Sequence, residues 1–347
     1  MRSIIRVIGA VQGVGYRPFI LRKATEYGIK GYVKNLGASV EILAIGEDAD
    51  VLSFVEVLKT DAPVGAIVLD VRVDEITDTS DIYPSFRENS PESEYFSIIN
   101  SSEIQFNDLP IFLPDIGICD DCMSEMLDPS DRRYRYPLIS CASCGPRISI
   151  LNKLPYDRDT TTMDKFKMCP KCDVEYRSGR RTHAQTISCH DCGPQMILDF
   201  YSDITDHTDN ESKGKAVLQH IEFDDAVITA TELLRNDNVI GLKGISGYQL
   251  VSKPVGTVAL KLRQLKGREN KPFAVMFSDI CSIKEYCHVS EKEEELLKSS
   301  ARPIVLLEKK KDFDYEVCKD SRYIGAFLPS SGIHRLLTDA VGPLIVT

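Results

Sequence analysis

The sequence lacks any apolar run of the ~18–20 residues that a helix needs to cross a bilayer. Its first residues, MRSIIRVIGAV, reach polar and glycine residues too early for the apolar core of a signal peptide. It also lacks a net positive charge, because its 42 Lys and Arg are outnumbered by 52 Asp and Glu. These absences predict a cytoplasmic protein without a membrane partner, and they make nucleic acid a poor electrostatic partner.

The cysteines favour metal binding over disulfides. The 347 residues are enough for two or three domains, and 11 of them are cysteine. Eleven cysteines would indicate disulfides in a small secreted chain, but eight of these form four Cys-x-x-Cys pairs in a chain without an export signal. The other three, Cys281, Cys287 and Cys318, are expected to be ordinary, partly buried thiols.

The first 100 residues show a regular alternation of strand and helix patterns. The periodicity predicts strands at 4–12, 29–35, 39–46 and 66–76, and helices at 19–28 and 48–63. This β-α-β-β-α-β order is that of the ferredoxin-like split βαβ unit. A short edge strand is expected at 96–99, followed by a connector at 101–118.

The middle of the chain contains an internal repeat. The first copy is CDDCMSEMLDPSDRRYRYPLISCASCGP and the second is CPKCDVEYRSGRRTHAQTISCHDCGP. Each copy runs Cys-x-x-Cys, an Arg-Arg pair and then Cys-x-x-Cys-Gly-Pro, and Cys119 and Cys169 start them 50 positions apart. Two copies are too few for a solenoid, so a duplicated small module is expected.

The spacing of the cysteine pairs is typical of four-thiolate zinc sites. A thioredoxin-type redox role would need a βαβ context, which the pattern lacks. His183 and His190 are expected to be surface or neighbouring groups, because the thiolates complete the ligand sets. Sequential pairing or a crossed arrangement would each give two closed, structural sites. In the sequential arrangement, the first set is Cys119, Cys122, Cys141 and Cys144, and the second is Cys169, Cys172, Cys189 and Cys192.

The last third predicts an α/β domain. A polar stretch at 201–215 is expected to be a linker with a domain boundary. From residue 225 on, helix and strand patterns alternate, which favours a mixed or parallel sheet. The sequence stops at Thr347 on a strand pattern, so we expect the chain to be a piece of a longer protein.

The stretch VIGAVQGVGYRPF raises the question of what its glycines and arginine bind. We call residues 12–16 the glycine loop. A strand-to-helix turn with Gly13 and Gly15 lets successive backbone amides converge on an anion, and Arg17 adds a planar fork that suits phosphate. A cation at a helix N-terminus is otherwise unfavourable, which favours a bound anion. An Arg17 head group held permanently by a carboxylate would contradict this interpretation.

The same stretch carries a family resemblance. VQGVGYRPF followed by GYVKN resembles the acylphosphatase signature, and the predicted element order agrees with that family's fold. The resemblance implies that Arg17 binds the phosphate and that Asn35 positions the attacking water. It also implies a phosphate-binding cradle made by Gln12, Gly13, Val14, Gly15 and Tyr16. Such hydrolysis needs charge stabilisation and an in-line water but no strong base.

A second group of cations lies in QLKGRENKPFAVMF. Cations at the end of a helix can simply offset the helix dipole, but their clustering before a buried strand also suits a triphosphate. The segment resembles the YrdC family, which makes acyl-type adenylates from ATP, and VIGLKGISGYQL resembles an earlier strand of that family. The resemblance implies a nucleotide site made by Lys243, Lys266, Arg268 and Lys271.

The ordered combination of these segments resembles the HypF carbamoyltransferase family of nickel–iron hydrogenase maturation. It implies an α+β multidomain protein with a ferredoxin-like acylphosphatase domain, two four-cysteine zinc modules and an α/β YrdC-like domain. The expected divisions are 1–100 for the acylphosphatase-like domain, 101–200 for the zinc-finger region and 201–347 for the YrdC-like domain, which is C-terminally incomplete.

The resemblance also implies a reaction path and partners. Carbamoyl phosphate would be hydrolysed to carbamate and phosphate, and ATP with Mg2+ would then give carbamoyl adenylate. In the full-length protein the carbamoyl group would pass to a cysteine of HypE, as precursor of the cyanide ligands. The alternative is a zinc-ribbon scaffold that binds RNA or protein through the Arg132–Arg133 and Arg180–Arg181 pairs, with inactive flanking domains. Net acidity and the intact VQGVGYR motif weigh against it.

Overall fold

The computed structural model describes residues 1–37, 39–63, 65–76, 95–101, 113–204 and 215–347. The contacts between residues divide the chain into two compact units. Unit 1 comprises Met1–Ile116 and Ser140–Ile187, and unit 2 comprises Gly117–Ile139 and Ser188–Thr347. The three domains expected from the sequence, at 1–100, 101–200 and 201–347, stay a prediction.

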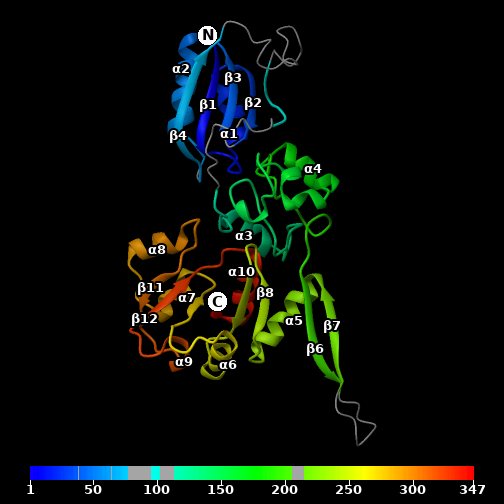
Figure 1. Cartoon of the computed structure of the whole chain (residues 1–347), viewed down its shortest axis with the longest axis vertical. Coiled ribbons are helices and arrows are strands. Elements are labelled where there is room, and N and C mark those ends of the chain that lie inside the picture. The colour runs from blue at the N-terminus through cyan, green and yellow to red at the C-terminus, as the bar shows by residue number, and fades with distance from the viewer. Residues whose placement is uncertain (38, 64, 77–94, 102–112, 205–214) are drawn as a thin grey trace, which may run out of the picture. The chain divides into compact units, whose positions relative to one another are not determined.

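Unit 1 is built on a five-stranded sheet with the strand order β4-β1-β3-β2-β5. Its elements are β1 (Arg2–Ala10), α1 (Tyr16–Glu26), β2 (Lys30–Leu36), β3 (Ser39–Ile45), α2 (Asp48–Thr60), β4 (Ile67–Glu75) and β5 (Phe96–Ile98). β5 pairs parallel with β2, and the other neighbouring strands pair antiparallel. The predicted ferredoxin-like order and the short edge strand are confirmed (Figure 1).

The core of this sheet lies on the face that both helices cover. Side chains two residues apart on a strand share a face, so Ile5 and Val7 of β1 point into the core together. Both are fully buried, in one cluster with Ile42 of β3. Phe19 of α1 and Phe54 of α2 belong to the same cluster, which fixes both helices on that face.

In the described remainder of unit 1 the helices are short. They are the 3-10 helices η2 (Ile148–Ile150), η3 (Arg158–Thr160) and η4 (Thr162–Lys165) and the α-helix α4 (Pro170–Arg177). Cys169 is the N-cap of α4, and Pro170 occupies its first turn, where a missing N–H costs nothing. The first cysteine of this copy therefore stands at a helix start, and the second, Cys172, is buried one turn later.

Unit 2 contains a mixed six-stranded sheet with the order β11-β12-β10-β13-β9-β8, and a separate two-stranded ribbon of β6 and β7. β10 and β12 pair parallel, and the other neighbours pair antiparallel. The strands are β6 (Ile197–Ile204), β7 (Lys215–Glu222), β8 (Ile240–Lys243), β9 (Tyr248–Ser252), β10 (Ala274–Met276), β11 (Val305–Glu308), β12 (Tyr323–Phe327) and β13 (Leu344–Val346). The helices are α3 (Asp120–Leu127), α5 (Phe223–Arg235), α6 (Gly256–Lys266), α7 (Ile280–Tyr286), α8 (Glu291–Lys298), α9 (Tyr315–Cys318) and α10 (Gly332–Val341).

A continuous apolar core holds the six-stranded sheet together. Leu262 of α6, Val275 of β10, Ile324 of β12 and Ile345 of β13 are all fully buried in it. Of the three cysteines outside the repeat, Cys287 and Cys318 are buried in this core, whereas Cys281 is exposed. The expectation of partial burial is therefore wrong in detail for all three. Burial raises the pKa of the Cys287 thiol to about 11.

The predicted linker at 201–215 is wrong for the residues at its two ends. Tyr201–Ile204 belong to β6, and Lys215 begins β7, with Tyr201 paired to Leu218. Residues 205–214 lie outside the described part of the chain. A two-stranded ribbon exposed to solvent needs no apolar face, so its composition resembles that of a linker. Of the helices that the structure describes, none is long and apolar enough to cross a membrane.

Candidate functional site

The glycine loop has the backbone conformation that its sequence predicts. Gly13 has φ 74° and Gly15 has φ 73°, a left-handed region that side chains with a Cβ rarely adopt. Gly15 is the N-cap of α1, so the first amides of the helix lack intrahelical partners. Within the described part of the chain, the amides of Gly13, Val14 and Gly15 donate to no backbone carbonyl. The loop therefore has amides to offer an anion at the positive end of a helix.

The sheet brings Asn35 to this loop. β1 and β2 both pair antiparallel with β3, so they run in the same direction, and both Val7 and Asn35 align with Val40. The loop that follows β1 and the end of β2 thus lie at the same edge of the sheet. Asn35, Gly13, Gly15, Tyr16 and Arg17 line one small pocket of about 20 Å³, together with residues including Tyr156, His183 and Gln185.

The side-chain amide of Asn35 has no hydrogen-bond partner among the residues that the structure describes. Asn35 is only 1% exposed, yet within that part of the chain neither its Nδ2 nor its Oδ1 is bonded. A buried amide without partners is rare, because it loses its bonds to water without replacement. A ligand or a water molecule in the pocket would restore those bonds. The pocket has about the volume of one water molecule.

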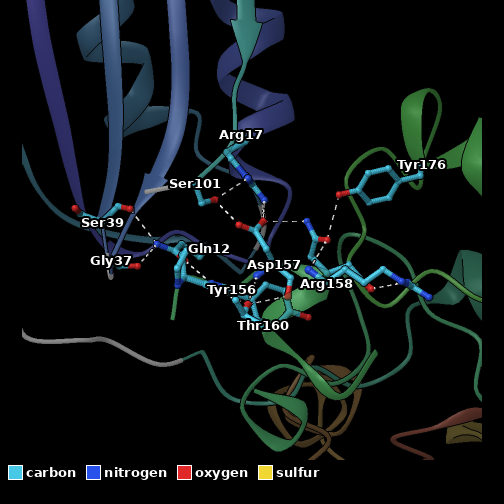
Figure 2. A network of polar contacts seen from close by, with 12 residues as sticks. Gln12, Arg17, Gly37, Ser39, Ser101, Tyr156, Asp157, Arg158, Thr160 and Tyr176 are labelled. Atoms are coloured by element: carbon cyan, nitrogen blue, oxygen red, sulfur yellow. Dashed lines mark hydrogen bonds and ion pairs between the residues drawn. The ribbon is translucent and has the colours of Figure 1, made fainter. Parts of the chain in front are cut away.

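The guanidinium of Arg17 already holds an anion, and this anion is the carboxylate of Asp157. Figure 2 shows the two side chains facing each other, with 2.6 Å between Arg17 Nη2 and Asp157 Oδ1. Arg17 Nη1 also donates to Ser101 Oγ at 3.5 Å, and Ser101 Oγ donates to Asp157 Oδ2. Arg17 is 12% exposed and Asp157 is 20% exposed, so the pair is partly desolvated. The expectation that the Arg17 head group has no carboxylate partner is wrong; its role towards phosphate stays a prediction.

Three side chains hold the glycine loop in place: Arg147 from outside it, and Gln12 and Tyr16 from within it. The Arg147 side chain is 3% exposed and donates from Nε to Gly13 O at 2.5 Å and from Nη2 to Ala142 O at 2.9 Å. Gln12 donates to Gly37 O and Ser39 O and accepts from the Tyr156 amide, at 2.8, 2.9 and 3.0 Å (Figure 2). The side chain of Gln12 thus braces the loop, and Tyr16 does likewise by donating to Leu58 O at 2.8 Å. Both side chains are thus bonded within unit 1, and the contribution of Gln12 and Tyr16 to phosphate binding stays a prediction.

A larger cavity of about 880 Å³ adjoins the small pocket. Arg17, His183 and Gln185 line both, and Asp157, Ser101, Lys153, Asp159 and Tyr176 are among the other residues of the larger one. Burial and the positive charge of Arg17 lower the pKa of His183 to about 4, so its ring is neutral at pH 7. Burial raises the pKa of the Tyr176 hydroxyl, which donates to Gln185 Oε1 at 3.1 Å. Apart from the Asp157 carboxylate, Arg17 thus has the neutral side chains of His183, Tyr176 and Gln185 in the same cavity.

The cysteines form two clusters in the sequential arrangement. Within each cluster the sulfurs all lie within 4.8 Å of one another, and the described cysteines are free of disulfides. The clusters are Cys119, Cys122, Cys141 and Cys144, and Cys169, Cys172, Cys189 and Cys192. The Sγ–Sγ distances of the Cys141–Cys144 and Cys189–Cys192 pairs are 3.7 and 3.8 Å. A tetrahedral ion with Zn–S bonds of about 2.3 Å has edges of about 3.8 Å, so the donor set fits zinc. His183 and His190 belong to neither cluster.

The two copies of the repeat exchange equivalent contacts. Arg133 donates from Nε to Ser188 O at 2.9 Å, and Arg181 donates from Nε to Ser140 O at 3.0 Å. Each serine directly precedes the third cysteine of the opposite copy, so the two bonds are counterparts. Both arginines are at least 95% buried. The second arginine of each Arg-Arg pair is thus an internal bond donor and not an exposed basic group.

The structure brings together only some of the residues predicted for a nucleotide. Lys266 Nζ and Arg268 Nη1 both donate to Thr347 Oγ1, each at 3.2 Å. Arg268 also donates from Nε to the backbone carbonyl of Lys271 at 3.2 Å. Lys243 instead lines a cavity of about 310 Å³ and lies 4.9 Å from the ring centroid of Tyr248. Among the described contacts, none links Lys243 to the other three residues.

Asp157 and Arg147 make contacts to Arg17 and to the glycine loop that the sequence did not reveal. They contact Arg17 and Gly13 across separations of 140 and 134 residues. Both lie between or beside cysteine pairs, where no local pattern connects them with a strand-to-helix turn. In the stretch PYDRDT, Asp157 is a carboxylate that belongs to neither the predicted phosphate site nor the predicted zinc sites.

Comparison with known families matches three parts of the chain. Residues 4–87 match the acylphosphatase family, and residues 118–151 and 168–198 match the HypF finger family. Residues 232–347 match the family described as telomere recombination, whose model covers the YrdC proteins. A ferredoxin-like domain with a glycine loop, two four-cysteine clusters and a YrdC-like domain therefore define the class of protein, in that order.

Individual relatives match over nearly the whole chain. The probable carbamoyltransferase HypF of Methanocaldococcus jannaschii is 40% identical over 344 residues, which cover 98% of this chain and 42% of that protein. The carbamoyltransferase HypF of Synechocystis is 34% identical, covering 99% of this chain and 42% of that protein. A crystal structure of full-length HypF in a phosphate- and nucleotide-bound form superposes with a TM-score of 0.84 at 34% identity, covering 100% of this chain and 42% of that one.

These matches confirm the family expected from the sequence. The chain belongs to the HypF carbamoyltransferase family, and it spans about two-fifths of the length of the curated relatives that it matches.

Proposed function

We propose that unit 1 hydrolyses an acyl phosphate at the glycine loop, and that carbamoyl phosphate is its substrate. The proposal rests chiefly on the buried side-chain amide of Asn35, which has no partner in the described part of the chain and lies in the same pocket as Gly13, Gly15 and Arg17. A water molecule bonded to that amide would lie beside a phosphoryl group bound by the loop. The proposal is supported by the carbamoyltransferase relatives and by the acylphosphatase match.

The reaction needs only positioning and charge stabilisation. The water oxygen attacks phosphorus, the bond between phosphorus and the acyl oxygen breaks, and carbamate leaves with the electron pair. The proton of the water passes to the phosphate product or to solvent. Amides of the loop and the guanidinium of Arg17 stabilise the charge on the phosphoryl oxygens, and Asn35 orients the water. Since the leaving carboxylate is already stable, no strong base is required.

Phosphate binding at this loop requires Arg17 to exchange partners. Its guanidinium now bonds to Asp157 at 2.6 Å, so the phosphoryl group competes with that carboxylate. A dianion supported by several amides and a helix N-terminus is the stronger acceptor, because each charge-assisted bond adds to the same group. The pair is therefore exchangeable in this proposal.

Measured release of phosphate tests the proposal. We expect the 347-residue chain to release phosphate from carbamoyl phosphate, and Arg17→Ala and Asn35→Ala to lower kcat by about 10²–10³. Lys30→Ala, at an exposed position on the same strand as Asn35, is the matched control and should keep full activity. Equal activity in the Asn35→Ala and Lys30→Ala variants would exclude Asn35 from the reaction.

The cysteine clusters are proposed to hold two structural Zn2+ ions. Four sulfurs per cluster leave no open position for a substrate, so the ions would stabilise the fold and not take part in the reaction. The ligands would be the eight clustered cysteines, with neither histidine involved. The alternative function as an RNA-binding scaffold loses support, because Arg133 and Arg181 are buried and bonded to backbone carbonyls.

ATP with Mg2+ is proposed as the ligand of unit 2, at the cations around Thr347. Lys266 and Arg268 converge there, and burial together with the neighbouring Arg263 lowers the pKa of Arg268, which marks a surplus of positive charge. The related HypF was solved in a nucleotide-bound form. Calorimetry should show weaker ATP binding in Arg268→Ala but not in Lys261→Ala, an exposed position on α6. In the full-length protein, transfer of the carbamoyl group through an adenylate to a HypE cysteine completes the proposed function.

A further inference from the structure

Asp157 is held in place by groups other than Arg17. Its amide donates to Thr160 Oγ1 at 3.0 Å, where η3 begins, and Gln185 Nε2 donates to its Oδ1 at 3.4 Å. Ser101 donates to the other carboxylate oxygen (Figure 2). These bonds do not depend on Arg17, so the carboxylate stays at the cavity wall when the guanidinium turns to another anion.

The acyl group of a substrate has one direction in which to extend. With its phosphoryl group at the glycine loop, the substrate occupies the small pocket that Arg17, His183 and Gln185 share with the larger cavity. The small pocket measures about 20 Å³ and the larger cavity about 880 Å³, so only the latter has room for the acyl group. The carboxylate of Asp157 lines this cavity directly beside Arg17.

When the guanidinium of Arg17 binds the phosphoryl group, Asp157 loses its charged hydrogen-bond donor. A partly buried carboxylate that loses a donor is strongly destabilised unless another donor replaces it. A carbamoyl group carries an NH2 that donates at this position, whereas an acetyl group presents a methyl that cannot. The two substrates are otherwise close in size, so the pocket would distinguish them through this bond.

Resting on the proposed function, we propose that Asp157 is a specificity-determining residue that selects carbamoyl phosphate over other acyl phosphates by accepting a hydrogen bond from its NH2 group. The neighbours suit this role. His183 is neutral, and Tyr176 is bonded to Gln185, so neither adds a cation that would neutralise the carboxylate. The same carboxylate repels a phosphate ion that brings no NH2, which disfavours retention of the product.

The test compares two substrates within each variant of the 347-residue chain. Values of kcat/KM are measured for carbamoyl phosphate and acetyl phosphate, after subtraction of the rate without protein. In Asp157→Ala we expect the carbamoyl-to-acetyl ratio to fall at least about tenfold, the usual effect of losing one hydrogen bond to a charged group. Asp157→Asn keeps an oxygen acceptor without the charge, so its ratio should fall less. Asp159→Asn removes an exposed charge from the same cavity and should leave the ratio unchanged.

Inorganic phosphate supplies a second readout. It brings no NH2 group, so it should inhibit Asp157→Ala more strongly than the unchanged protein, since the carboxylate no longer competes for Arg17. Partial misfolding lowers the rates with both substrates together and leaves their ratio unchanged. If Asp157→Ala does not fold, Asp157→Asn replaces it in the comparison. An unchanged ratio in both Asp157 variants overturns the proposal. Absence of phosphate release from both substrates by the unchanged chain instead refutes the proposed function.

Discussion

Replacing Asn35 by alanine should stabilise the protein while it lowers the rate of hydrolysis. Asn35 is 1% exposed, and its two polar side-chain atoms have no hydrogen-bond partner among the described residues. A buried polar group without partners costs about 1–3 kcal/mol, so its removal should stabilise the fold. The small cavity left when Ala replaces Asn offsets part of this stabilisation. We therefore expect Asn35→Ala to raise the free energy of unfolding by about 1 kcal/mol.

Gln12→Ala is the comparison within the same unit. The Gln12 side chain makes three hydrogen bonds, to Gly37 O, Ser39 O and the Tyr156 amide, so its loss should lower the free energy of unfolding by about 1.5–4 kcal/mol. Because the two units need not unfold together, hydrogen exchange at the amides of β2 and β3 is the appropriate assay. Slower exchange in Asn35→Ala and faster exchange in Gln12→Ala are expected. If Asn35→Ala were destabilised like Gln12→Ala, Asn35 would be a structural residue and the argument for a water-positioning amide would be refuted.

Three further predictions concern the loop, the clusters and a buried histidine. Calorimetry should show that Gly13→Ala weakens phosphate binding more than Gly15→Ala does. Both glycines have a left-handed φ, but a Cβ at Gly13 would lie 2.9 Å from Arg147 Cδ. The control is Gly28→Ala, at φ 65° with open space around it, which should leave phosphate binding unchanged. Cys141→Ser should lower the zinc content measured by mass spectrometry from two ions to one per chain, and loss of both ions would contradict independent clusters. Burial lowers the pKa of His334 from 6.5 to about 4, so between these pH values the unfolded state binds more protons than the folded state. The free energy of unfolding should therefore fall by up to about 3 kcal/mol as the pH drops from 6.5 to 4. His334→Gln should flatten this dependence in urea unfolding, and an unaltered slope would show that another group titrates.

Features carried by local sequence were predictable, and those that join distant segments were not. The glycine loop and the cysteine pairs each need only a few neighbouring residues, so their spacing expresses their chemistry directly. The choice between sequential and crossed cysteine clusters depended on tertiary structure. So did the Arg17–Asp157 pair, whose partners are 140 residues apart. The ferredoxin-like order followed from periodicity, because each of its strands has one face in a single core.

The errors have physical reasons as well. β9 (Tyr248–Ser252) was not separated from the preceding strand, because the turn before it is only four residues long. The described side chains of the ribbon of β6 and β7 are exposed or only half-buried, so they give a weak strand pattern. Lys243 was grouped with the other cations by resemblance; it lines a cavity of about 310 Å³, and its part in a nucleotide site stays a prediction.

A crystal structure of the 347-residue chain with orthovanadate, an analogue of the phosphoryl transition state, tests the central claim most directly. We predict that the anion lies on the amides of the glycine loop, that the guanidinium of Arg17 has turned to it from Asp157, and that an apical oxygen bonds to the Asn35 amide. An anion bound elsewhere, with Arg17 still paired to Asp157, would contradict this account of the site.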